Sequence, residues 1–303
     1  MVICSKVSPY FFVAKFILVL SSIFLLASCS KKEVSNIKDS YLENQKSFKN
    51  SSLQSMESFN QSEKIINPEV SKIEYVFSQM SERFKSEVKI EQNEYDSFIN
   101  DLNLLLQEDK KSVDDISLFY LVDKKHFLSS DYVPRNLIPL KENSLYKISK
   151  NNLFLRKEAE EALKELSRAA LNDGITLTVS STYRSYEYQD SLFSYWVKVD
   201  GIEEAERESA RAGTSQHQAG CAIDFGNIED SFINTKEGLW LSENAHKYGW
   251  SLSFPKGYED VTGYRWECWH YRYLGKTFLE IQQKWFNNIQ QFALEFFDIW
   301  KNL

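Results

Sequence analysis

Two stretches of the chain carry apolar residues at helical spacing. In the first, which runs from about Ser71 to Leu106, apolar side chains recur every three or four residues. They are Ile73, Val76, Phe77, Met80, Phe84 and Val88, followed by Phe98, Ile99, Leu102 and Leu106. This pattern predicts two helices in a helical region over 71–111. The second stretch, 276–303, is aromatic and amphipathic and predicts one long C-terminal helix, with 281–303 as an extension. Packing against the protein is the default for that helix, and a membrane-facing role is the alternative.

Between these stretches, helical and strand patterns mix without strict alternation. Alternating apolar and hydroxyl residues at 175–180 predict a half-buried strand. Further strands are expected at 118–122, 222–225, 250–254 and 266–273, and helices at 154–172, 186–199, 202–212 and 235–248. Such a mixture predicts an α+β domain, a small antiparallel sheet flanked by helices, over 112–280.

The N-terminus has the pattern of an export signal. Lys6 and Lys15 accompany an apolar run at 16–26, which is too short to cross a bilayer comfortably. The sequence from Leu26 to Cys29 resembles a bacterial lipobox, so 1–28 is expected to be a lipoprotein signal peptide and Cys29 the lipidated residue. A secretory signal with an incidental cysteine is the alternative. The polar segment 29–70 is expected to be a flexible tether, and the protein to be extracytoplasmic and membrane-anchored.

The net charge argues against a nucleic-acid ligand, and the cysteine content argues against a disulfide framework. The formal net charge is −7, and loss of the two signal-peptide lysines takes it to −9, so no nucleic acid is expected as a ligand. Beyond Cys29, the mature chain retains Cys221 and Cys268, which are expected to be small buried residues rather than a disulfide framework.

Metal-ligating residues cluster in two short motifs. His217 and Asp224 lie within ten residues of each other, His270 follows about forty residues later, and the chain has only four histidines. Hydrolytic zinc sites use three protein ligands, and these three residues are the natural set for one zinc ion per chain. Strand alternation puts Asp224 on the face opposite to Cys221, which is therefore expected to point into the core.

Glu267 is the candidate general base and acid beside this metal set. Strict alternation would put Glu267 and His270 on opposite faces of one strand, so either the strand is bulged or it begins after Glu267. Cys268 shares parity with His270, and the sequence leaves open whether it touches the metal site.

Arg184 follows the strand expected at 175–180. A guanidinium there can hold a carboxylate through two parallel hydrogen bonds, or stabilise an oxyanion. Trp269 either forms a wall of the pocket or packs in the core.

Together these motifs resemble a known enzyme family. They are Ser215-x-His217-x-x-Gly220-x-Ala222-x-Asp224, Glu267-x-Trp269-His270, and Ser181-Thr182-Tyr183-Arg184-Ser185 with Gln189. They are similar to those of the VanY-type D-alanyl-D-alanine carboxypeptidases and LdcB-type L,D-carboxypeptidases, over roughly 115–280. The resemblance implies that His217, Asp224 and His270 bind zinc, that Glu267 is the general base and acid, and that Arg184 contacts the substrate. It further associates Ser215 and Gln189 with the terminal residue of the peptide. Tyr183 and Trp269 are the other candidate substrate-binding residues.

The leading hypothesis is a zinc carboxypeptidase that removes a terminal D-alanine from peptidoglycan stem peptides. A peptidoglycan endopeptidase of the same zinc fold and a non-catalytic cell-wall-binding lipoprotein are the alternatives. The sequence leaves open whether the substrate is a tetrapeptide or a pentapeptide, what 71–111 and the C-terminal run do, and the oligomeric state.

Overall fold

The computed structural model describes residues 68–111 and 115–303. The expected signal peptide, the lipidation site at Cys29 and nearly all of the expected tether lie outside these residues. Among the described helices, none combines the length and the apolar character that a membrane crossing requires.

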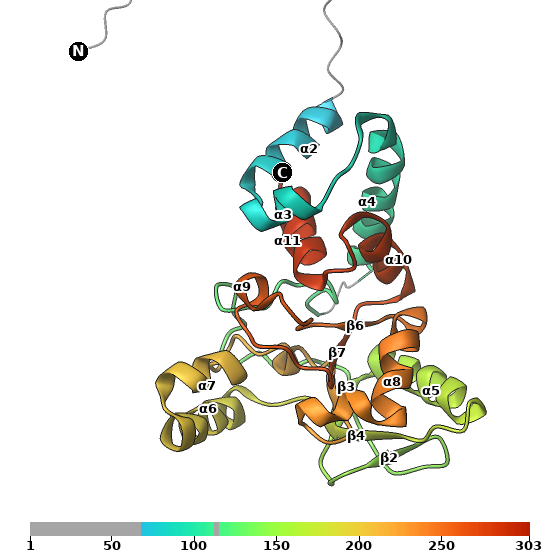
Figure 1. Ribbon diagram of the computed structural model, residues 1–303, viewed down its shortest axis with the longest axis vertical. Helices are drawn as coiled ribbons and strands as arrows, with labels where there is room; N and C mark the ends of the chain where they lie inside the picture. Colours follow the sequence, from blue (N-terminus) through green and yellow to red (C-terminus); the bar gives the residue numbers. More distant parts are fainter. Residues whose placement is uncertain (1–67, 112–114) are drawn as a thin grey trace, which may run out of the picture. The chain divides into compact units, whose positions relative to one another are not determined.

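A five-stranded mixed sheet organises the middle of the chain (Figure 1). Its strands, in spatial order, are β2 (Tyr146–Ile148), β4 (Leu177–Ser181), β5 (Ala222–Phe225), β7 (His270–Tyr273) and β6 (Trp250–Leu252). The expected small antiparallel sheet is confirmed for β4, β5, β7 and β6, whereas the edge strand β2 pairs with β4 in parallel. Two further strands, β1 (Leu137–Pro139) and β3 (Phe154–Arg156), form a separate antiparallel ribbon. The sequence pattern predicted neither β1 nor β2, and it assigned β3 to the start of a helix.

Helices flank the sheet, as the α+β prediction requires. They are α5 (Lys157–Asn172), α6 (Tyr186–Asp200), α7 (Ile202–Glu208), α8 (Lys236–Asn244) and α9 (Glu259–Thr262), with short 3-10 turns η4 (Gln216–Ala219), η5 (Asp230–Asn234) and η6 (Ala245–Tyr248). Apolar side chains of α5, such as Leu163 and Leu166, form one hydrophobic core with Ile223 and Phe225 of β5. Helices α6 and α7 lie together at another edge of the domain (Figure 1).

The expected strand at 118–122 is wrong. This segment has no strand partner, and its carbonyl groups are bonded by a side chain instead: the buried Arg272 donates to the carbonyl oxygens of Leu118 and Tyr120, at 2.8 and 2.7 Å. The apolar run therefore reflects burial rather than sheet pairing, since Phe119 and Leu121 are both buried.

The N-terminal and C-terminal helices share a second hydrophobic core. The N-terminal region forms three α-helices rather than the expected two: α2 (Pro68–Gln79), α3 (Glu82–Glu87) and α4 (Tyr95–Asp109), with a 3-10 turn η3 (Gln92–Glu94) before α4. The first helical stretch is divided into α2 and α3 near Ser81. The Ser81 hydroxyl caps the start of α3 by accepting from the backbone N–H of Phe84.

The expected single C-terminal helix is also wrong, because the run forms α10 (Lys276–Trp285) and α11 (Gln290–Lys301). Asn287 and Asn288 between them adopt positive φ angles of 50° and 57°, which interrupt a right-handed helix. The second core buries three aromatic residues of α11, Phe292, Phe296 and Trp300. These side chains therefore pack against the rest of the protein, as the default expectation had it.

Candidate functional site

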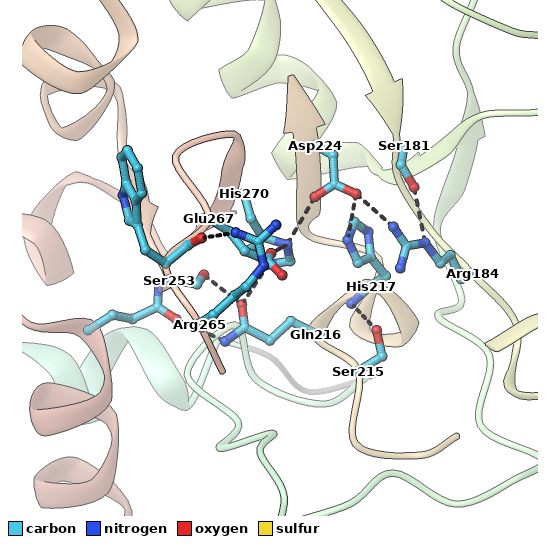
Figure 2. A network of polar contacts seen from close by, with 12 residues as sticks. Ser181, Arg184, Ser215, Gln216, His217, Asp224, Ser253, Arg265, Glu267 and His270 are labelled. Atoms are coloured by element: carbon cyan, nitrogen blue, oxygen red, sulfur yellow. Dashed lines mark hydrogen bonds and ion pairs between the residues drawn. The ribbon is translucent and has the colours of Figure 1, made fainter. Parts of the chain in front are cut away.

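His217, Asp224 and His270 converge at the centre of the sheet. One potential ligand atom from each lies within 4.8 Å of the others, and all three residues are buried. The side chains come from three elements: η4 carries His217, β5 carries Asp224, and His270 is the first residue of β7 (Figure 2). The structure thus brings together the three residues that the sequence predicted as a metal set.

Local structure explains how His217 reaches the strand residues. The Ser215 hydroxyl caps η4 by accepting from the backbone N–H of His217. Gly220 ends this turn in the left-handed conformation, with φ of 71°. A Cβ atom there would also approach Pro134, Arg156 and Leu137 to 3.0–3.1 Å, so glycine suits both the conformation and the space.

Each histidine presents one ring nitrogen to the Asp224 carboxylate, His217 its Nε2 and His270 its Nδ1. His217 Nδ1 lies 2.8 Å from the carbonyl oxygen of Thr182, an acceptor, so a neutral imidazole with its proton on Nδ1 satisfies this contact. In that tautomer the lone pair is on His217 Nε2, which lies 3.2 Å from Asp224 Oδ2. His270 Nε2 lies 3.2 Å from Gln216 Oε1, again an acceptor, and its Nδ1 lies 3.0 Å from Asp224 Oδ1.

This donor set fits a divalent metal. A cation shared with Asp224 can be coordinated by the ring nitrogens of both histidines that face this carboxylate, and two histidines with one carboxylate are ligands that zinc takes in hydrolytic sites. Each imidazole also has its other nitrogen held by a protein acceptor, which is how metal-binding histidines are usually oriented.

The electrostatics of the site favour neutral histidine and ionised aspartate. Burial, assisted by the charge of Arg184, lowers the pKa of His217 to about 4. Burial alone would raise the pKa of Asp224, but His217, His270 and Arg184 outweigh it and hold that pKa well below its usual range. These are the protonation states in which both groups can ligate a cation.

Glu267 lies in the chain just before β7. The strand begins at His270, so Glu267 lies outside it and strand alternation does not determine the side to which Glu267 points. Glu267 Oε2 lies 3.6 Å from His270 Nδ1. Burial first, and the charge of Asp224 second, raise the pKa of Glu267 well above its usual range. The site therefore pairs a low-pKa carboxylate with a high-pKa one, an arrangement typical of catalytic acid and base groups.

The two cysteines point elsewhere. Cys221 is fully buried in the first hydrophobic core, as predicted from strand parity. The Cys268 thiol lies 3.7 and 3.8 Å from the carbonyl oxygens of Glu229 and Asp230, so it faces the η5 turn. Both are free thiols.

Arg184 extends over the site from the end of β4. Its NH2 donates to Asp224 Oδ2 at 2.7 Å, its Nε to the Ser181 hydroxyl at 3.0 Å, and its NH1 to Gln189 Oε1 at 3.3 Å. Gln189 is fully buried and holds Arg184 from behind, while its own amide donates to the carbonyl oxygen of Ala210. The structure thus gives Gln189 a positioning contact with Arg184, and its direct contact with a substrate stays a prediction.

These groups open into a pocket of about 280 Å³. Ser215, Trp269, Glu267 and Arg184 line it, together with the three metal-set residues, whereas the half-buried Tyr183 is not among its lining residues. Trp269 is both pocket-lining and part of the first core, so the two sequence interpretations of it are compatible.

Sequence reasoning missed further lining residues on α6 and elsewhere in the pocket. Those on α6 are Tyr188, Leu192 and Trp196, spaced by four residues along one helix face, and the others include Glu208, Tyr264, Arg265 and Gln291. The four-residue spacing was visible in the sequence, but only the fold shows which way this face points. Gln216 was also missed, although it lies inside the motif between Ser215 and His217.

Comparisons with known proteins agree with the motif resemblance. Residues 152–276 match the family model of VanY, D-alanyl-D-alanine carboxypeptidase. The chain is 38% identical over 175 residues to YodJ of Bacillus subtilis (strain 168), a protein named as a carboxypeptidase, and this match covers 55% of the chain and 63% of that protein. It is 28% identical over 160 residues to a D-alanyl-D-alanine carboxypeptidase of Enterococcus faecium, which covers 51% of the chain and 50% of that protein.

A solved structure of the LdcB LD-carboxypeptidase, described for its peptidoglycan recognition, is also similar. It has 34% sequence identity and a TM-score of 0.52, with 59% of this chain and 84% of that chain covered. The chain spans about half to two thirds of the length of the two named sequence relatives. Through the domain that carries the site, this chain belongs to the VanY family of D-alanyl-D-alanine carboxypeptidases.

Proposed function

We propose that the protein is a zinc-dependent carboxypeptidase that removes a terminal D-alanine from peptidoglycan stem peptides. One observation carries the proposal: a pocket that holds a two-histidine, one-carboxylate donor set also holds a second, buried carboxyl group and a guanidinium. Those groups are the parts that a metal-dependent hydrolase needs for a substrate ending in a carboxylate.

The metal ligands in this proposal are His217 through Nε2, Asp224 through its carboxylate, and His270 through Nδ1. These are the atoms that face one another across the site. When bound, zinc supplies Lewis-acid chemistry, polarising the scissile carbonyl group and acidifying water. One ion per chain is expected.

Glu267 acts in the proposal as general base and then general acid. Its carboxyl group lines the pocket and lies 3.6 Å from His270 Nδ1, so it is within reach of a water molecule that attacks a carbonyl group at the site. It takes the proton of that water and returns it to the amine of the departing D-alanine.

Arg184 recognises the terminal carboxylate in the proposal. A guanidinium has five N–H donors, and the bonds to Asp224, Ser181 and Gln189 engage three of its nitrogens through one N–H each. The second N–H groups of NH1 and NH2 are suited to a bidentate carboxylate contact. Ser215 and Trp269 line the pocket beside Arg184. Gln189 and Tyr183 are proposed to help bind the substrate there.

The substrate class rests on family membership and on the names of the relatives. One relative is named a D-alanyl-D-alanine carboxypeptidase and another an LD-carboxypeptidase with peptidoglycan recognition. Both names fit release of one C-terminal residue, so we expect a stem peptide as the substrate.

Product analysis tests this function. The protein is incubated with matched tetrapeptide and pentapeptide muropeptides, with zinc and with excess chelator, and the products are identified by mass spectrometry. We expect loss of a single D-alanine in zinc only, and the preferred muropeptide identifies the substrate length. Cleavage of a cross-linked muropeptide into two peptides would identify an endopeptidase instead. If no muropeptide is changed, the result would favour a non-catalytic cell-wall-binding protein.

The extracytoplasmic location and lipid anchor are part of the proposal and rest on the N-terminal sequence pattern. Cys29→Ser should move the protein from the membrane fraction to the soluble fraction of the producing bacterium. Equal membrane content in that variant would contradict the anchor and leave the enzymatic proposal intact.

A further inference from the structure

Three buried side chains close a ring of hydrogen bonds beneath His270. Gln216 donates from Nε2 to Gln290 Oε1 at 3.2 Å, Gln290 donates from Nε2 to the Ser253 hydroxyl at 3.1 Å, and Ser253 donates to Gln216 Oε1 at 2.7 Å. None of the three is more than 6% exposed. Ser253, Gln216 and the imidazole of His270 lie together in Figure 2.

The ring determines which way the Gln216 amide faces. A glutamine side chain has a donor end and an acceptor end of nearly the same shape, and only its partners distinguish them. Rotation of the Gln216 amide by half a turn would set its NH2 against the Ser253 hydroxyl and its oxygen against Gln290 Oε1, which is also an acceptor. Gln290 does not turn with it, because its Nε2 also donates to the backbone carbonyl oxygen of Ser251 at 3.4 Å. Because all three side chains are buried, such a mismatch would destabilise the reversed orientation.

The orientation of Gln216 in turn determines which nitrogen of His270 carries the proton. Gln216 Oε1 is the atom that faces His270 Nε2, at 3.2 Å, and a carbonyl oxygen can only accept. With a cation held at Nδ1, the nitrogen that faces Asp224 at 3.0 Å, His270 would therefore carry its proton on Nε2 and donate it to Gln216 Oε1. With the amide reversed, the wrong nitrogen would be protonated.

We propose that Gln216 and Gln290 are positioning residues of the metal centre. Helix α11 then contributes to the site, because it carries Gln290. This inference rests on the proposed zinc function and assigns a role outside the family-matched segment, because Gln290 lies beyond residue 276. Gln290 is the first residue of α11, and the second hydrophobic core holds that helix in place through Phe292 and Phe296. The C-terminal helix thus supports a metal ligand two contacts away.

The test compares Gln216→Met and Gln290→Met in the full-length protein. Methionine keeps the length of the side chain and removes both amide groups. Zinc affinity is measured by competition with a chromophoric chelator, and the His270 Nε2–H proton is followed by NMR in the zinc-loaded protein. We expect Gln216→Met to bind zinc about 10- to 100-fold more weakly, as is typical when the partner of a ligating histidine is lost, and its Nε2–H proton to exchange faster. Gln290→Met should show a smaller loss in the same direction.

Two further variants separate positioning from general damage. Gln216→Glu retains an oxygen acceptor for His270 but sets a second acceptor against Gln290 Oε1, so it should bind zinc more tightly than Gln216→Met and more weakly than wild type. Gln282→Met is the matched control, because Gln282 is equally buried and bonds Ser251 and Asn288 rather than the ring. It should lose stability without losing zinc affinity.

Each outcome decides the inference. Zinc affinity and Nε2–H exchange unchanged in Gln216→Met would overturn the role of Gln216. A Gln290→Met variant indistinguishable from Gln282→Met would overturn the role of Gln290 and α11. Failure of the wild-type protein to bind zinc would overturn the proposed function together with this inference, whereas equal binding by wild type and variants overturns the inference alone.

Discussion

Asp224 and His270 are direct cross-strand partners on the antiparallel strands β5 and β7, and Asp224 Oδ1 lies 3.0 Å from His270 Nδ1. Side chains of directly opposed residues project from the same face of a sheet, so this register alone brings two ligands of the candidate centre together. A one-residue slip would send one of them to the opposite face. The position of the site is therefore tied to the pairing of two short, buried strands.

Zinc should stabilise the folded protein through this pair. A ligand that binds only the folded state at a hundred times its Kd adds about 2.7 kcal/mol, and in a protein of this size that corresponds to a Tm increase of about 5–10 °C. Differential scanning calorimetry of metal-stripped protein, with and without added zinc, measures the shift. Asp224→Ala should lose the shift, and an equal increase in that variant would place the metal elsewhere.

Glu267→Gln should separate metal binding from turnover. The variant keeps the shape of the side chain but cannot take a proton, so we expect kcat to fall by about a thousandfold or more while the zinc content stays at one per chain. D-alanine release and metal analysis give the two readings. Glu280→Gln, at an exposed position of α10, is the control for charge removal. Turnover of Glu267→Gln at the wild-type rate would rule out the assignment of the base.

Arg184→Lys should weaken recognition of the substrate terminus. Lysine retains the charge but not the fork that holds a carboxylate by two bonds, so KM for a D-alanine-terminated peptide should increase by about tenfold or more. Steady-state kinetics with saturating zinc measure the change, and Arg168→Lys on the exposed side of α5 serves as the control. Because Arg184 also contacts Asp224, zinc affinity is measured in parallel. An unchanged KM would contradict the carboxylate contact.

Glu237 should make stability depend on pH. Burial raises the pKa of this carboxyl group to about 6, although its Oε1 accepts a 2.7 Å hydrogen bond from the backbone N–H of Thr178. Because the folded-state pKa is raised, the stabilising contribution of the protonated form is complete below about pH 4.5 and is lost as the pH increases through 6. Glu237→Gln retains the acceptor without the charge.

We therefore expect Glu237→Gln to gain little at pH 4 and about 1–2 kcal/mol of unfolding free energy relative to wild type above pH 7. Urea unfolding at intervals from pH 4 to 8 measures the difference. Glu243→Gln, exposed on the same helix, accounts for the general effect of removing one negative charge. A difference between Glu237→Gln and wild type that stays constant with pH would contradict this explanation.

Phe296→Ala should destabilise the whole described region. Phe296 is fully buried, and its ring centroid lies 5.2 Å from that of Phe98 and 5.6 Å from that of Phe77, so it joins α11 to α4 and α2. Such a truncation costs about 3–5 kcal/mol, measurable by denaturant unfolding. Phe127→Ala, at a position 68% exposed, should change stability by less than about 0.5 kcal/mol. A loss for Phe296→Ala no larger than for Phe127→Ala would contradict a stabilising second core.

The sequence by itself determined the α+β class, the residues that form the candidate metal set and the direction in which Cys221 points. Each follows from a local rule, since side-chain type limits metal chemistry and strand alternation separates Cys221 from Asp224. The sequence also posed the choice at Glu267 correctly, between a bulged strand and one that begins later.

Only the tertiary structure decided the rest. Hydrogen-bond partners, not the apolar pattern, determine that 118–122 is irregular, because its carbonyl oxygens are bonded by Arg272 from β7. Two consecutive asparagines of positive φ divide the C-terminal run, and this break sets Gln290 beside Gln216, 74 residues earlier. No local pattern encodes such a contact, because it arises from the packing of a helix that begins after the last strand. The outer support of the candidate site is therefore a property of the packed chain, whereas its ligands can be identified in the sequence.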